Sequence, residues 1–510
     1  MKCFIFKHIS IGVTILFLAG GCSKSFLDQE IPGKASQEDF YKTDADATLA
    51  TTAAYDLLQA HYNWGWSSIL LVKILLSDES NAGGSGAGDQ PAYQGLDKYN
   101  FDSQNAAVLG AWRMCYYGIY RANKVITYVK PETALRKRLI AECKVLRAYA
   151  YLDLVSLWGD VPLVLGDVPK EVYNKMSRTP KAEVYAQIAK DLNEAIPDLP
   201  VKKAYTGGDR FRVAKGTAQA LLGRAYLYQE KWADAATQLD AVIKSGQYEL
   251  EPDFGTAFAR VGKFGMESLM EVNYSDKGKY DWNNFPWNNG RKLESNINIQ
   301  LMGPRSDYYK KAPSDSLLGG WGFNTPTKKM YNAFVQAGDV KRRKYTIMTE
   351  AELTAAGGEW TGGSSYEYEG FFQRKYGSFV SETTTETGAI AELNYGTNWR
   401  LLRYSDVLLM AAEAYYRSND EDRARAELKK VRIRAGLSPV SASGNALFEA
   451  IVKERQLELA YEGYRFLDLV RWGRAEQELG PLGFRKGTHE VLPIPDEDVK
   501  IAGLKQNENY

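Results

Sequence analysis

The chain has 510 residues, more than a single hydrophobic core needs, so we expect subregions that share one large body. Its 64 basic and 63 acidic side chains leave a formal net charge of +1, which offers no electrostatic basis for binding nucleic acid or an anionic membrane. After the N-terminal segment, no apolar run reaches the ~20 residues of a membrane span.

The N-terminus has the pattern of an export signal. Lys2 and Lys7 supply positive charge, residues 9–19 are mostly apolar, and small residues precede Cys22. The string LAGGC is close to a lipobox, although it departs at the third residue before the cysteine, so Cys22 is a candidate for lipid attachment. The alternative is an ordinary signal peptide beside a coincidental cysteine. Both alternatives remove residues 1–21 and place the protein outside the cytoplasm.

Two cysteines remain in the mature chain, Cys115 and Cys143, and both lie inside helical patterns. They are interpreted as two small buried apolar residues, with a disulfide in an oxidising compartment as the alternative.

The N-terminal part is predicted to be helical. Apolar residues recur at spacings of three and four over 45–76 and 105–158, which indicates paired amphipathic helices. Between them, SDESNAGGSGAGDQPAYQG (77–95) is rich in Gly, Ser, Asn and Asp and is predicted to be a loop, either a plain connector or part of a binding site.

An internal repeat is the clearest organisational signal. The first copy contains Tyr226, Ala235, Leu239 and Val242. The second copy has the same residue types at the same spacing, namely Tyr415, Ala424, Leu428 and Val431. Leu222 and Gly223 precede the first tyrosine, as in a tetratricopeptide repeat, where small residues let two helices approach. We therefore predict a mainly α fold, in which helix pairs at 213–246 and 401–436 stack into a solenoid-like scaffold.

The stretch between the repeats has a different composition. It contains WNNFPWNNG (282–290), GGWGFNTPT (319–327) and GGEWTGGSSYEYEG (357–370), separated by short helical pieces, and irregular stretches of this length are usually functional. The predicted organisation is a signal peptide (1–21), an N-terminal helical region (22–250), a loop-rich insertion with the candidate ligand site (251–400) and a C-terminal region (401–510).

Several blocks resemble those of SusD/RagB-type lipoproteins. They are CKVLRAYAYLDLVSLWGDVPLVLG (143–166), LLRYSDVLLMAAEAYY (401–416) and IVKERQLELAYEGYRFLDLVRWG (451–473), with NEAIPDLP, GWGFNTPT, LPIPDEDV and NENY in family order. The resemblance covers essentially the whole mature chain.

This resemblance implies a surface-exposed, lipid-anchored protein of the outer membrane that pairs with a SusC-like TonB-dependent transporter. It implies capture of an oligosaccharide, less often a peptide, for import. We expect no catalysis, no cofactor and no metal ligands. The alternative is a peptide-binding or purely protein-interaction module built on the same repeats.

A glycosidase is the rival class, because it too needs paired carboxylates near aromatic residues. The pairs Asp78 with Glu79 and Asp406 with Glu413 lie beside helix or turn signals and are interpreted as cap or salt-bridge partners. His61 and His489 are the only mature histidines, which argues against a histidine-rich metal site or a serine–histidine–aspartate relay. The charged run from Arg455 is interpreted as structural, with an anionic-ligand site as the alternative.

Sugar recognition requires a flat aromatic face flanked by amide and carboxylate groups. The loops supply both, and the candidate ligand-binding residues are Trp282, Trp287, Trp321, Tyr93, Asn81 and Asp89. The family's ligand aromatics come from these same regions, but only Trp321 lies in a matched motif. The alternative for each tryptophan is a surface plug over the helical core, and Trp64 and Trp66 are interpreted as core.

Overall fold

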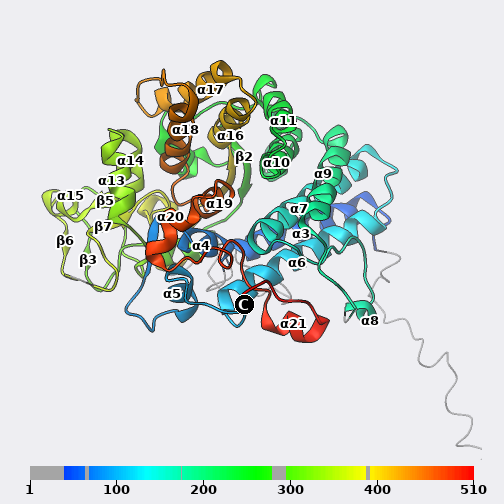
Figure 1. Ribbon diagram of the computed structural model, residues 1–510, viewed down its shortest axis with the longest axis horizontal. Coiled ribbons are helices and arrows are strands. Elements are labelled where there is room, and N and C mark those ends of the chain that lie inside the picture. The colour runs from blue at the N-terminus through cyan, green and yellow to red at the C-terminus, as the bar shows by residue number, and fades with distance from the viewer. Residues whose placement is uncertain (1–39, 64–67, 174, 278–294, 364, 386–390) are drawn as a thin grey trace, which may run out of the picture.

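The computed structural model describes residues 40–63, 68–173, 175–277, 295–363, 365–385 and 391–510, and it is mostly helical (Figure 1). This confirms the predicted fold class. Five residues with roles predicted from the sequence lie outside the described residues, namely Cys22, Trp64, Trp66, Trp282 and Trp287. Among the helices that are described, none combines the length and the apolar character needed to cross a membrane.

Long N-terminal helices form one side of the molecule. They are α3 (Asp44–Asn63), α6 (Ala106–Tyr128), α7 (Ala134–Trp158) and α9 (Lys181–Ala195). Asn105 and Thr133 cap α6 and α7 through side-chain oxygens that accept from backbone N–H groups of the first turn. Helix α7 contacts α3, α6 and α9, so it is covered on several sides and is buried along most of its length.

Cys115 on α6 and Cys143 on α7 are free thiols buried in this packing. The interpretation as two small core residues is therefore confirmed. Burial raises the pKa of both thiols, which keeps them neutral.

The predicted repeat forms two helix pairs. The first is α10 (Lys215–Leu227) with α11 (Trp232–Lys244), the second is α16 (Tyr404–Arg417) with α17 (Glu421–Arg434), and α11 packs on α16. The matched positions Ala235, Leu239, Val242, Ala424, Leu428 and Val431 are all fully buried. A Cβ atom on Gly223 would lie 2.7 Å from Leu239 Cγ, so the glycine does permit the close approach of α10 and α11.

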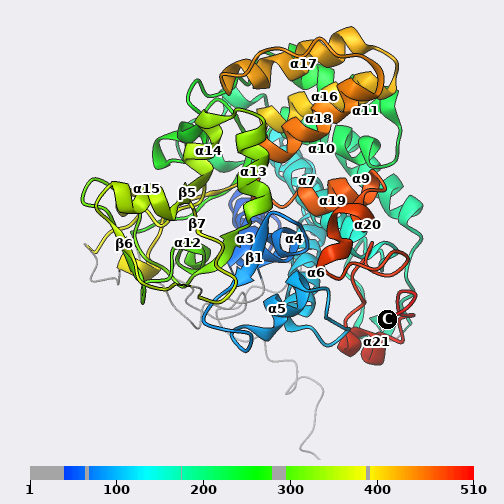
Figure 2. The same cartoon turned by 60° about the vertical axis from the view of Figure 1, so that its left-hand side comes forward.

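Further elements lie between and after these pairs. The helices are α12 (Ile297–Met302), α13 (Lys328–Gln336), α14 (Val340–Thr346), α15 (Glu350–Ala355), α18 (Gly444–Glu458), α19 (Arg465–Arg471), α20 (Ala475–Leu479) and α21 (Asp496–Ala502). The strands form two-stranded antiparallel sheets, which are β2 (Ser268–Val272) with β8 (Trp399–Arg403), β3 (Tyr309–Lys310) with β6 (Glu359–Trp360), and β5 (Ile347–Thr349) with β7 (Phe371–Gln373). Figure 2 shows β5, β6, β7 and α15 gathered at one edge, away from α11, α16 and α17.

The prediction of a loop over 77–95 is wrong in part. This segment contains the strand β1 (Ser80–Gly83) and the start of the helix α5 (Pro91–Asp97). The strand pairs with β4 (Phe323–Pro326), which is remote in sequence, so its partner could not be recognised from local composition.

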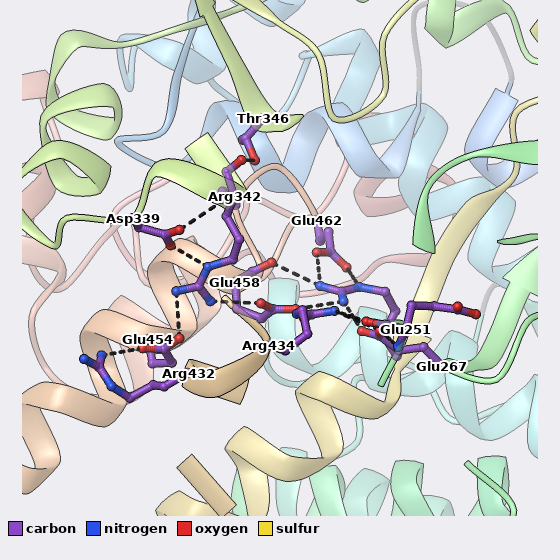
Figure 3. A network of polar contacts seen from close by, with 12 residues as sticks. Glu251, Glu267, Asp339, Arg342, Thr346, Arg432, Arg434, Glu454, Glu458 and Glu462 are labelled. Atoms are coloured by element: carbon purple, nitrogen blue, oxygen red, sulfur yellow. Dashed lines mark hydrogen bonds and ion pairs between the residues drawn. The ribbon is translucent and has the colours of Figure 1, made fainter. Parts of the chain in front are cut away.

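A buried network of ion pairs joins the second helix pair to the insertion (Figure 3). Glu458, at the end of α18, pairs with Arg342 of α14, Arg403 of β8 and Arg434 of α17. Burial alone would raise the pKa of Glu458, but the three guanidinium groups outweigh it and hold that pKa well below its usual range. The charged run is therefore structural, as predicted, but Glu458 pairs with residues of other elements, and α18 ends at Glu458, so Glu462 does not continue the same helix.

Candidate functional site

The β1–β4 ribbon brings together two of the regions predicted to bind ligand. Asn81 lies opposite Thr325 and Gly83 opposite Phe323. Beyond the strands, Gly84 N donates to Gly322 O over 2.8 Å. The glycine-rich 77–95 segment and the GGWGFN segment are therefore neighbours in the folded chain.

Glycines allow this junction to form. Gly83 and Gly84 have φ angles of 75° and 90°, and a Cβ on Gly83 would lie 2.2 Å from the Gly322 carbonyl oxygen. Gly320 lies against α12, where a Cβ would come within 2.4 Å of Gln300 O. These glycines serve the close crossing of backbones, a role that the sequence alone did not assign to them.

Trp321 is half-buried and packs partly against the main core. Its backbone is held on both sides, because Trp321 N donates to Gln300 O over 2.9 Å and Arg305 Nη1 donates to Trp321 O over 3.2 Å. With its side-chain amide in the orientation that satisfies both ends, Gln300 accepts at its oxygen from the indole Nε1 over 3.3 Å and donates from its nitrogen to Glu392 O. The indole is thus oriented by hydrogen bonds and keeps part of its surface exposed.

Asn324, which follows Trp321 closely, points inward. It is fully buried, and its Nδ2 lies 3.0 Å from the sulfur of Met302. It is therefore not placed to bind a ligand beside the indole.

Asn81 holds the ribbon to the segment that follows β6. Its Nδ2 donates to Glu367 O over 3.0 Å and to Glu369 Oε1 over 2.8 Å, and the residue is 8% exposed. Gly83 N also donates to Glu367 Oε2, over 3.2 Å. The amide of Asn81 therefore already has partners within the protein.

Asp89 closes the glycine-rich loop. Its carboxylate accepts from both the backbone N and the hydroxyl of Ser85, each over 2.8 Å. The side chain remains partly exposed, so Asp89 lies at the surface near the ribbon.

The assignment of Tyr93 to a ligand site is corrected by its burial. Tyr93 lies on α5 with 1% of its surface exposed, and its hydroxyl oxygen accepts from Ser68 N over 3.3 Å. A sugar ring needs an open aromatic face, which a core residue cannot offer. Tyr93 lies in the core because its segment forms the helix α5, whereas the composition of the segment predicted a loop.

A group of aromatic residues near the ribbon was not selected as a site from the sequence. Trp360 of β6 packs edge-on against Tyr308, and its ring centre lies 4.5 Å from that of Tyr368. Gly362 covers another part of the ring, since a Cβ there would lie 2.5 Å from the indole. These aromatics mainly pack on one another, and the groove between them and the ribbon has only about 20 Å³ of free volume.

The carboxylates considered for catalysis mostly serve as ion-pair partners. Asp78 pairs with Arg465, Asp406 with Arg455, and Glu413 with Arg471. Each of these aspartates and the glutamate is buried, so the predicted structural role is confirmed for them.

Cys115, His61 and Asp153 form a buried cluster that superficially suggests a nucleophilic relay. Cys115 Sγ lies 3.8 Å and Asp153 Oδ2 lies 3.6 Å from the same atom, His61 Nε2. A relay needs the nucleophile and the carboxylate on opposite ring nitrogens. This cluster therefore lacks the geometry for proton transfer to a nucleophile.

Comparisons with known proteins agree on one family. The profile of the SusD family matches residues 340–510, and a profile described as "Starch-binding associating with outer membrane" matches residues 76–227. SusD-like protein P2 of Formosa agariphila is 26% identical over 97% of this chain and 98% of its own length.

Solved structures give the same result. A laminarin-binding SusD-like protein is 33% identical, with a TM-score of 0.82 over 92% of this chain and 100% of its own. Surface glycan-binding protein A from Bacteroides thetaiotaomicron, solved in complex with laminarihexaose, is 26% identical, with a TM-score of 0.78 over the same shares. Because a relative 33% identical is matched over its whole length and the profile of the SusD family matches residues 340–510, this chain belongs to the SusD family.

Proposed function

We propose that this protein binds an oligosaccharide, without cleaving it, on the surface around Trp321. The observation that carries the proposal is the indole itself, which is partly exposed and oriented through its Nε1 and through both flanking peptide groups. A pre-oriented aromatic face stacks on the C–H side of a sugar ring at little cost in side-chain entropy.

The identity of the ligand class is supported by the relatives. The relative with 33% identity is described as laminarin-binding, and another was solved with laminarihexaose. Both descriptions favour a glycan over the peptide alternative.

Two further candidates from the sequence, Trp282 and Trp287, lie outside the described residues. We keep both as proposed ligand contacts on the strength of the sequence, and we retain Asp89 as a peripheral candidate.

The direct test is Trp321→Ala. If the indole stacks on a sugar, the dissociation constant for laminarin oligosaccharides should rise by about five- to 150-fold, equivalent to roughly 1–3 kcal/mol. Titration calorimetry with product analysis measures affinity and any cleavage together. Trp232→Ala is a matched control, because Trp232 is also half-buried but lies on α11.

Three outcomes would count against the proposal. Wild-type affinity with a lowered melting temperature would make Trp321 a plug over the core. Cleavage of the glycan would show an enzyme. Binding of peptides alone would favour the interaction module.

We further propose that Cys22 carries a lipid that anchors the protein at the outer surface, where it passes its ligand to a SusC-like TonB-dependent transporter. The LAGGC string and the outer-membrane description of the matched profile support this placement. Cys22→Ala should move the protein to the soluble fraction, and purification from mildly solubilised membranes should recover a large barrel with the wild type. If Cys22→Ala left the distribution between membrane and soluble fractions unchanged, the lipid anchor would be contradicted. Purification of the wild type as a lone monomer would contradict the pairing with a transporter.

A further inference from the structure

A second cavity lies away from the ribbon. It has a volume of about 710 Å³, within the range typical of ligand sites, whereas the groove beside the ribbon has about 20 Å³. Phe258 and Ala259 line one part of it, next to the short helix η5 (Phe254–Ala257), and Met348 and Leu353 line another. The latter two belong to a small separate apolar cluster, so the cavity lies where this cluster meets the main core.

Tyr345 of α14 presents a fixed aromatic ring in this cavity. A Cβ on Gly255 would lie only 2.3 Å from the ring, so the ring rests directly on the backbone of η5. Its hydroxyl donates to Asp253 Oδ2 over 2.8 Å. Even so, 44% of the residue is exposed, which leaves a positioned ring available for stacking.

The carboxylates that line the cavity are all compensated. Asp315 pairs with Arg374, and Glu352 pairs with Arg343 over 2.6 Å. Glu382 lies 4.0 Å from Arg260 Nε and also accepts from Arg260 N over 2.9 Å. These carboxylates therefore contribute little free negative charge.

The basic side chains are not balanced in the same way. Lys375 is buried and directs its ammonium to Glu462 and to the carbonyl oxygens of Glu458 and Ala460, away from any ligand. Lys341 and Lys344 also line the cavity, are exposed, and form no ion pair with any residue that the structure describes. Lys341 and Lys344 are therefore basic side chains that line the same cavity as Tyr345 and are not neutralised by an ion pair among the described residues.

We propose that this cavity is a second saccharide site, one that selects saccharides bearing carboxylate or sulfate groups. Tyr345 supplies the stacking face, and Lys341 and Lys344 supply the charge. The site shares no residue with the Trp321 surface, so it goes beyond the function proposed above and can be tested independently of it.

The experiment uses the purified protein with three matched probes, which are neutral, carboxymethylated and sulfated laminarin oligosaccharides. The double variant Lys341→Glu/Lys344→Glu should weaken binding of the charged probes by roughly tenfold or more, as expected for loss of hydrogen bonds to charged groups. Binding of the neutral probe should not change. The charge-matched control is Lys137→Glu/Lys429→Glu, which places the same reversal on exposed positions of α7 and α17.

Two further variants test the aromatic ring. Gly255→Ala should displace the ring and weaken binding of the charged probes, whereas Tyr345→Phe loses the bond to Asp253 but keeps the ring and should retain most of the affinity. Trp321→Ala should leave charged-probe binding at this cavity intact. Thermal melts of all variants establish that they are folded.

Equal loss in the control double variant would show a general charge effect and overturn the proposal. So would unchanged affinity in the Lys341→Glu/Lys344→Glu variant, or binding of acidic peptides in place of saccharides. A preference for carboxymethylated or for sulfated probes would identify which anion the site takes.

Discussion

Glycine permits close packing in both the first helix pair and the region of the β1–β4 ribbon, but the groups that approach it differ. In the first helix pair, Gly223 makes room for the side chain of Leu239 from the adjoining helix. In the ribbon Gly83 makes room for the carbonyl oxygen of Gly322, and just before β4 Gly320 makes room for that of Gln300. A side chain can shift to a neighbouring rotamer, whereas a hydrogen-bonded backbone cannot, so the ribbon tolerates less change and defines its local geometry more tightly.

The two regions also differ in how polar groups are used. Around the second helix pair, guanidinium and carboxylate groups are buried together, as at Arg342, which is fully buried and contacts Asp339, Glu454 and Glu458. Around Trp321, the hydrogen bonds are mostly between backbone groups and neutral side chains. The scaffold is therefore the region whose stability depends most on charge.

Breaking the buried ion network should have the largest effect. Arg342→Met leaves buried carboxylates without one of their partners, and the free energy of unfolding should fall by about 3–5 kcal/mol. Chemical denaturation measures this loss. Arg425→Met removes surface pairs with Glu421 and Asp422 and should leave the denaturation midpoint unchanged. Equal effects from both variants would contradict the assignment of stability to the buried network.

The junction between the two regions should respond to pH through Glu79. Its carboxylate accepts from Tyr461 N over 3.1 Å, and its carbonyl oxygen accepts from Thr327 N, next to β4. Burial, followed by the charge of Asp78, raises the pKa of Glu79 from 4.5 to about 8. The folded protein therefore keeps a proton on Glu79 that the unfolded chain releases above pH 4.5.

The contribution of Glu79 to the free energy of unfolding is fully present below pH 4.5 and is lost as the pH rises to about 8. The wild type should lose stability relative to Glu79→Gln by an amount on the order of a few kcal/mol between pH 5 and pH 8. Denaturation of both proteins across this range measures the difference. A constant difference would mean that Glu79 has an ordinary pKa in the folded state.

The glycine comparison should give the smallest change in stability and the sharpest contrast in binding. Gly223→Ala forces a Cβ to 2.7 Å from Leu239 and should cost roughly 1–3 kcal/mol of stability without changing the affinity for oligosaccharide. Gly320→Ala brings a Cβ to 2.4 Å from Gln300 O and should shift Trp321, so affinity should fall. Calorimetric titration and thermal melts of both variants separate the effects. Wild-type affinity in Gly320→Ala would show that the close contact between Gly320 and Gln300 O does not position the binding surface.

Much of the scaffold could be predicted from the sequence. The periodic apolar residues of the repeat, such as Leu239 and Leu428, are buried as expected, because a helix places residues three and four apart on one face. The structural role of the charged run was also predictable, since its alternating signs indicate ion pairs. Its partners were not, because Arg342 and Arg403 come from elements remote in sequence.

The candidate site was predicted by region and only partly by residue. Trp321 is oriented at the surface of the ribbon, whereas Tyr93 is in the core and Asn81 is used to hold the segment at Glu367. The cavity beside Tyr345 had no signal in the sequence, because Gly255 and Tyr345 form it only after η5 and α14 pack together.

The sequence by itself determined the export signal pattern, the mainly helical scaffold and the family, since these depend on spacing along the chain. The tertiary structure alone decided which aromatic rings are open, which amides are already bonded and which lysines lack a partner. The physical reason is that exposure and pairing depend on contacts between segments far apart in sequence, and no local pattern encodes such contacts.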